Sequence, residues 1–146
     1  MIDKYKNLIV NIASRVMAPF MMLYALYALF HGHSSPGGGF QGGSIMAAGV
    51  MLLRLTLGRE RSSKKFPVWM APFFGTIGVM IYAGTGIFAM LGGGNYLDYG
   101  YMPLPFLSTE EHRYWGILFI EIGVFLGVSG IMVTIFDCLT AGDSDD

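Results

Sequence analysis

Four long apolar stretches constrain the fold of this sequence more than any other feature. They cover residues 8–30, 40–57, 68–91 and 114–139. At about 1.5 Å of rise per helical residue each stretch reaches roughly 27 Å or more, and the hydrocarbon core of a bilayer is about 30 Å thick. None of them has the polar face that a helix of a soluble bundle needs. The sequence therefore predicts an all-α integral membrane protein with four transmembrane helices.

The composition and the placement of charges agree with this interpretation. Hydrophobic residues make up 53% of the chain and charged residues only 13%, whereas roughly a quarter of a soluble domain is charged. We expect one transmembrane domain over residues 1–139, followed by an acidic flexible tail over residues 140–146. The net charge of −1 argues against binding to nucleic acid, and the single Cys138 excludes a thiolate cluster within the chain.

The basic residues predict how the chain is oriented in the cell membrane. The connections at residues 31–43 and 92–113 hold few of them, and cytoplasmic connections are the ones enriched in Lys and Arg. Both termini of this multi-pass protein are therefore expected to be cytoplasmic. The residues that mark the cytoplasmic side are Lys4, Lys6, Arg59, Arg61, Lys64 and Lys65.

The connection between the first two stretches reads His-Gly-His-Ser-Ser-Pro-Gly-Gly-Gly-Phe-Gln-Gly-Gly over residues 31–43. Glycine and proline in this number predict an irregular Gly/Pro-rich loop, with the second helix beginning at Ser44 as its N-cap. A helix from Ser44 to Leu57 is about 21 Å long, shorter than the hydrocarbon core. Either the helix continues to about Arg61 or the loop enters the membrane. A short span beside such a segment is a pointer to an ion or substrate site in transport proteins.

Gly37, Gly39 and Gly42 also match the spacing of a dinucleotide-binding fingerprint. That fingerprint requires a strand before it and an acidic residue about twenty positions later. Here an apolar helix candidate precedes the glycines, and the basic segment at residues 59–65 lies at that distance. We therefore reject this alternative.

Small residues gather on one face of each of the last two predicted helices. Such faces allow close packing against other helices, and two of them in one chain favour a protein surrounded by partners. The residues are Ala71, Gly75, Gly78, Thr85 and Gly86 in the third stretch and Gly123, Gly127 and Gly130 in the fourth.

Glu121 is the leading candidate for a functional residue. It lies about two turns inside the last predicted helix, where a carboxylate costs roughly 2.5–3.5 kcal/mol on insertion scales. Its side chain should therefore face a partner or a cavity. We expect Glu121 to act in or beside an ion path, and the alternative is a structural hydrogen bond to a neighbouring subunit.

His31 and His33 lie on the same predicted side of the membrane as Glu121 and complete the set of ion-path candidates. Two histidines and a carboxylate are ligands that suit Zn²⁺ or Fe²⁺. No further His or Cys ligand lies near them, so we expect no metal site. They are expected to cap the open end of the first helix or to serve as ionisable groups beside the ion path.

Arg15, Arg54 and Asp137 form a second predicted polar layer, on the cytoplasmic side. Nothing in the sequence resembles a nucleophile with its base or a phosphate-binding loop. We therefore expect neither a cofactor nor an enzyme that acts alone.

The run of residues 31–43 resembles the signature G-H-x-x-P-G-G-G-F-x-G-G of the MnhB family, the B subunits of Mrp-type multisubunit cation/proton antiporters. The similarity extends over almost the whole chain, including an acidic residue followed by Gly-Val early in the fourth helix, here Glu121-Ile-Gly-Val. The signature residues in this sequence are His33, Pro36, Gly37, Gly38, Gly39, Phe40, Gly42 and Gly43.

The resemblance implies a small accessory membrane subunit that works in the lipid bilayer with other membrane subunits. Na⁺ and H⁺ would be the transported ions of such a complex. A homologous protein is part of the sodium-translocating module of membrane-bound hydrogenase and related respiratory complexes, and the sequence does not separate the two parent complexes. A purely structural membrane subunit remains a third interpretation.

Overall fold

The structure is a computed structural model that describes residues 2–32, 37–99 and 109–141. Four of its helices are long and apolar enough to cross a membrane by length and composition, so the prediction of an all-helical fold with four candidate spans is confirmed. A fifth helix is short and lies in the basic connection. The helices are α1 (Ile2–Phe30), α2 (Gly38–Leu57), α3 (Arg59–Ser63), α4 (Met70–Leu91) and α5 (Thr109–Ala141).

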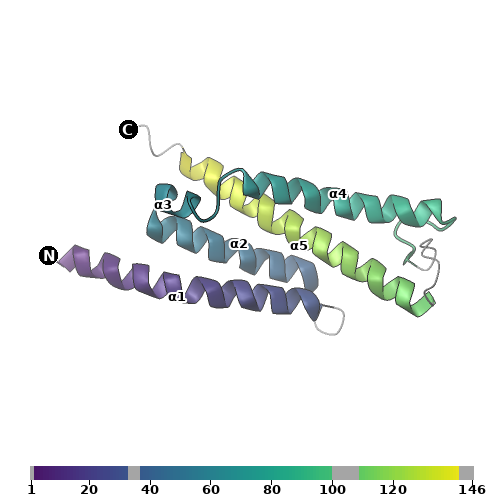
Figure 1. The fold of residues 1–146 in the computed structure, drawn as a ribbon, viewed down its shortest axis with the longest axis horizontal. Coiled ribbons are helices and arrows are strands. Elements are labelled where there is room, and N and C mark those ends of the chain that lie inside the picture. Colours follow the sequence, from purple (N-terminus) through teal and green to yellow (C-terminus); the bar gives the residue numbers. More distant parts are fainter. Residues whose placement is uncertain (1, 33–36, 100–108, 142–146) are drawn as a thin grey trace.

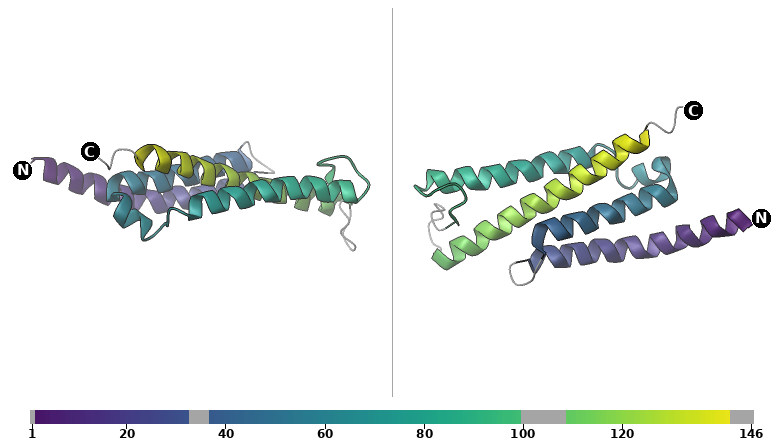
Figure 2. Two further views of the ribbon diagram at one scale, coloured as in Figure 1. Left: turned by 90° about the horizontal axis from the view of Figure 1, so that it is seen from above. Right: turned by 180° about the vertical axis from the view of Figure 1, so that it is seen from behind.

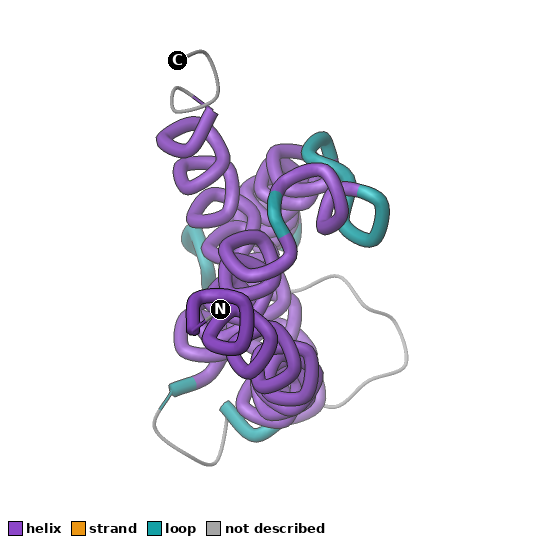
Figure 3. Tube along the Cα trace, turned by 90° about the vertical axis from the view of Figure 1, so that its left-hand side faces the viewer, coloured by secondary structure: helices purple, strands orange, loops and turns teal. Residues whose placement is uncertain are grey.

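The long helices lie side by side in a layer instead of surrounding a common centre (Figures 1 and 3). Their order across the layer is α1, α2, α5, α4, because α5 packs against both α2 and α4, whereas α1 packs mainly on α2. The layer is thin when seen from above (Figure 2, left). Most of its two broad faces is therefore not covered by other parts of the described chain.

The second long helix begins earlier than the sequence predicted. It starts at Gly38, after Gly37 with φ 142° as its N-cap, so the prediction of a start at Ser44 is wrong. Ser44 lies inside α2 and its Oγ donates to the carbonyl of Phe40 at 2.9 Å. The 20 residues of α2 extend about 30 Å, enough for a bilayer core without either adjustment that the sequence had suggested. Residues 33–36 of the predicted loop lie outside the described part.

The glycines of α2 are explained by close packing. A Cβ on Gly39 would collide with the backbone carbonyl of Glu121 on α5. A Cβ on Gly42 would lie 2.7 Å from the carbonyl oxygen of Ala25 on α1, and one on Gly43 would lie 2.7 Å from that of Phe125 on α5. Backbones this close leave no room for a side chain. The contacts with α1 and α5 therefore outweigh the roughly 0.5–1 kcal/mol that each glycine costs in a helix relative to alanine.

The basic connection after α2 forms a corner. Gly58, with φ 77°, ends α2 and precedes α3, whose Ser62 N–H donates to the Gly58 carbonyl at 3.1 Å. The alternative in which the second helix continues to Arg61 is therefore wrong. A positive φ is accessible to glycine at little cost, which explains why the chain turns here.

The small-residue faces of α4 and α5 meet each other. The backbones of Gly75 and Gly130 are in close contact, and a Cβ on Gly78 would lie 2.5 Å from the carbonyl oxygen of Gly123. The predicted close helix packing is confirmed. Because both faces are used inside the chain, they provide no evidence for partner subunits.

Candidate functional site

Glu121 of α5 lies where α1 ends and α2 begins. The side chain is half-buried. A Cβ built on Gly32, just after α1, would lie 2.5 Å from its Oε1 and 2.7 Å from its Oε2, and one on Gly38 would lie 3.0 Å from Oε1. We call Gly32, Gly38, Gly39 and Glu121 the Glu121 junction. Its glycines bring the α1–α2 backbone directly against the carboxylate.

The start of α2 is an electrostatically favourable place for this carboxylate. The first N–H groups of a helix have no partner within the helix, and the helix dipole makes this end positive. Gly37, the N-cap, has no side chain with which to cap them, and the first turn of α2 contains no acidic residue. The Glu121 carboxylate therefore supplies from α5 the negative charge that this helix end favours.

Of the two histidines predicted to accompany Glu121, the structure describes His31. His31 is exposed, and its ring stacks on Tyr27 with centroids 4.2 Å apart. Its Nδ1 lies 3.2 Å from the carbonyl oxygen of Tyr27, so the ring sits over the last turn of α1. His33 and Pro36 fall outside the described residues. Within the described part of the chain, no group of three or more His, Cys, Asp or Glu side chains is arranged to hold a metal ion.

The predicted inner polar layer is divided by the structure. Arg54 on α2 and Asp137 on α5 form a buried ion pair, with Nη2 and Oδ2 2.9 Å apart and side chains 3% and 5% exposed. Arg54 Nη2 also donates to the carbonyl oxygen of Phe66 at 3.4 Å. Arg15 on α1 is exposed instead and does not join the pair.

Sequence reasoning missed a hydrogen bond that joins α1 to α2. The buried Ser14 Oγ donates to Thr56 Oγ1 at 2.8 Å, and Thr56 donates in turn to the carbonyl oxygen of Leu52. Both residues are isolated hydroxyls in apolar stretches. That pattern alone did not reveal that they face each other.

At the end of the layer where Glu121 lies, the connection after α4 packs against both α4 and α5. The Tyr96 ring lies against Gly86, and a Cβ on Gly116 would lie 2.7 Å from the Tyr99 Cβ. Burial raises the pKa of the Tyr99 phenol above its usual value, and the neighbouring Tyr82 and Tyr96 raise it further. A neutral phenol is therefore favoured at this contact.

Four apolar spans in one layer, with a carboxylate at a helix start and a buried ion pair, define a small multi-pass helical membrane protein. A family model described as "Domain related to MnhB subunit of Na+/H+ antiporter" matches residues 9–134. The chain therefore belongs to the MnhB family of Na⁺/H⁺ antiporter proteins, as the signature at residues 31–43 predicted.

Individual relatives are similar over nearly their full length. The chain is 30% identical over 139 residues to the B subunit of the Na(+)/H(+) antiporter of Bacillus subtilis (strain 168), covering 94% of this chain and 95% of that protein. It is 29% identical over 144 residues to the protein of the same description in Alkalihalophilus pseudofirmus, with 97% and 96% covered. A putative antiporter subunit mnhB2 of Staphylococcus haemolyticus is 27% identical, with 97% and 99% covered. These matches indicate a transporter subunit and not a catalytic enzyme.

Proposed function

We propose that this chain is the B subunit of a multisubunit Na⁺/H⁺ antiporter in the cell membrane, contributing both to assembly of the complex and to its ion path. Full-length similarity to B subunits of such antiporters supports the proposal. Co-purification of the tagged chain would test it. Other antiporter subunits are the expected partners, whereas a hydrogenase subunit among them would assign the chain to a respiratory complex.

The role in assembly is supported by the surface of the layer. Large apolar side chains are exposed along the spans, for example Phe20 at 68%, Met80 at 68% and Leu91 at 77%. The buried core contains few large side chains, because its fully buried residues include Ala18, Ala25, Ala47 and Ala89. A thin layer with this distribution gains most of its apolar burial from lipid and from neighbouring subunits. Exposed Arg15 within the first span favours an acidic or polar group on one of those neighbours.

The role in the ion path rests on one observation, the position of the Glu121 carboxylate at the start of α2. Carboxyl groups inside membrane spans commonly mark ion and proton pathways. A passing Na⁺ or H⁺ would meet the Glu121 carboxyl group at this helix start. Arg54, the buried cation of α2, pairs with Asp137 at the far end of the helix. His31 and Gly37, which are next to Gly32 and Gly38 in sequence, are both exposed.

Glu121→Gln tests this role because it keeps the shape of the side chain and removes its charge. We expect the variant to assemble normally, while cation/proton exchange in everted vesicles falls or its pH profile shifts. Glu121→Asp should retain part of the activity. Glu111→Gln, exposed on the same helix, is the matched control and should leave exchange unchanged.

The measurement must separate assembly from transport. Subunit content is read from the purified complex, and exchange from the vesicles. If the Glu121→Gln complex has normal subunit composition and exchanges ions with an unchanged pH profile, Glu121 acts only in packing. Loss of the complex itself would support the structural interpretation.

A further inference from the structure

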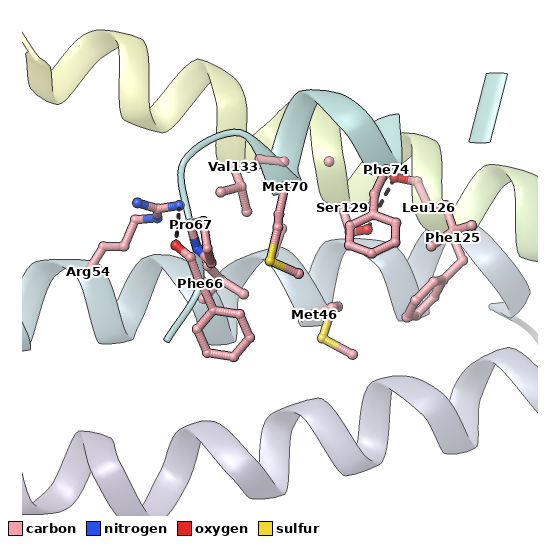
Figure 4. A pocket seen from close by; sticks show the side chains of 14 residues that line it. Met46, Arg54, Phe66, Pro67, Met70, Phe74, Phe125, Leu126, Ser129 and Val133 are labelled. Atoms are coloured by element: carbon pink, nitrogen blue, oxygen red, sulfur yellow. Dashed lines mark hydrogen bonds between the residues drawn. The ribbon is translucent and has the colours of Figure 1, made fainter. Parts of the chain in front are cut away.

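A cavity of about 210 Å³ lies between α2 and α4, and residues of α5 form its third wall. It exists because α2 and α4 each pack on α5 but not on each other. Figure 4 shows Arg54 and Phe66 at one end of the cavity and Phe125 at the other. Its walls are almost entirely apolar, and they include Met46 and Val50 of α2, Met70 and Phe74 of α4, and Phe125 and Val133 of α5.

Arg54 closes one end of the cavity. Its Nη2 is engaged by Asp137 and by the carbonyl oxygen of Phe66. Nε and Nη1 are buried and have no hydrogen-bond partner among the described residues, but no ligand atom in the cavity can reach them. The cavity itself therefore suits an apolar chain, and a polar group of the same ligand must lie outside it.

Three basic residues lie in the connection that leads to the same end of the cavity. Arg61, Lys64 and Lys65 are exposed in the corner between α2 and α4, and Phe66 and Pro67, which line the cavity, follow directly in sequence. Basic residues next to a span attract anionic lipid headgroups. The apolar walls and the basic residues beside them therefore point to an amphipathic ligand with an anionic headgroup.

We propose that the cavity binds one acyl chain of an anionic phospholipid. The acyl chain lies against the apolar walls, and the phosphate lies outside the cavity among Arg61, Lys64 and Lys65. A helix of a partner subunit is too wide for this space: two turns, about 11 Å long and at least 10 Å across, occupy on the order of 850 Å³. A single chain is narrow enough to lie between α2 and α4.

Photo-cross-linking tests the proposal on the complex purified with the tagged chain. The probe is phosphatidylglycerol with a photoactivatable acyl chain, supplied as a minor fraction in phosphatidylcholine vesicles. We expect cross-links to the lining residues of α2, α4 and α5, identified by peptide mapping. The same reactive chain on phosphatidylcholine should label these residues far less.

Two kinds of variant distinguish this site from lipid that merely surrounds the protein. Val50→Phe fills the cavity and should abolish the cross-links, whereas Val79→Phe, beside other cavities that no charged residue lines, should not. Lys64→Gln with Lys65→Gln leaves the fold untouched at two exposed positions. It should lower labelling by phosphatidylglycerol by about 5- to 30-fold, the effect of one or two basic residues near a membrane surface.

Several results would overturn the proposal. Equal labelling by the two lipids would mean surrounding lipid only, as would labelling that Val50→Phe leaves unchanged. Labelling that withstands loss of both lysines would remove the assigned headgroup contacts. A partner subunit's side chain found cross-linked inside the cavity would assign the space to that subunit.

Discussion

Removal of Asp137 should destabilise the chain more than any substitution at an exposed charge. Asp137→Ala leaves the Arg54 guanidinium buried, with its side chain 3% exposed and the 2.9 Å ion pair lost. Breaking one side of a buried pair typically costs about 3–5 kcal/mol, because the remaining charge is uncompensated. We expect about 3 kcal/mol, since the long Arg54 side chain lies near a membrane end and can turn toward water. The unfolded fraction should rise on the order of a hundredfold.

A double variant separates the cost of an unpaired charge from the worth of the pair. Arg54→Met combined with Asp137→Leu replaces both partners by apolar groups of similar volume. Such replacements are often neutral or stabilising, because neither charge must then be desolvated. The double variant should therefore be close to the parent protein, and clearly more stable than Asp137→Ala.

The assay is the midpoint temperature at which the fluorescently tagged chain is lost from the detergent-solubilised complex. Arg61→Met is the matched control, because it also removes a positive charge from this end of the layer but from an exposed side chain. It should leave the midpoint nearly unchanged. Two results would refute the reasoning. One is a midpoint of the double variant that falls by the sum of the losses from the two single substitutions, and the other is an Asp137→Ala midpoint equal to that of the control.

Two further predictions concern packing and topology. Gly78→Ala should weaken the α4–α5 contact and lower the midpoint temperature, because its Cβ would meet the Gly123 carbonyl. The Cβ of Gly84→Ala, on the same helix, meets no atom within 4 Å, so this variant should be tolerated or slightly stabilising. Equal midpoints for the two variants would contradict this packing. A cysteine at Asn95 should react with an impermeant thiol reagent from outside the cell and one at Ser63 should not, since the basic residues predict that α3 is cytoplasmic. External labelling of the Ser63 variant would contradict this orientation.

The spans could be predicted from the sequence because membrane helices need length and apolarity above all else. The start of α2 could not, for a reason that Gly39 and Gly43 illustrate. Intrinsic propensity disfavours glycine in a helix, so the run at residues 37–43 indicated a loop. The close approach of α5 requires the absence of side chains on α2, and that requirement is visible only once both helices are placed. Tertiary packing thus outweighed local propensity.

For a similar reason, the sequence could identify Glu121 but not its contacts. Glu121 could be singled out by its depth in an apolar stretch, which is a property of the sequence around it. Its contact with Gly32 and Gly38 joins positions far apart in the chain and depends on how α5 lies across the layer. Arg15 and Arg54 looked alike in sequence, each a lone arginine in a span. Only Arg54 lies on the side of its helix that meets α5, so only Arg54 finds an acid there.

The two polar sites are related through the pairing of α2 with α5. Gly38 and Arg54 are as far apart along α2 as Glu121 and Asp137 are along α5, about 24 Å at 1.5 Å per residue. The helices run in the same direction, so Glu121 and Asp137 of α5 each meet one end of α2 (Figure 1). Glu121 lies at the positive end of the α2 dipole, and Arg54 lies in its last turn, where positive charge is favoured. A shift of α5 by one turn would remove both arrangements together, and this shared register is why the glycines of α2 matter for the ion pair at its far end.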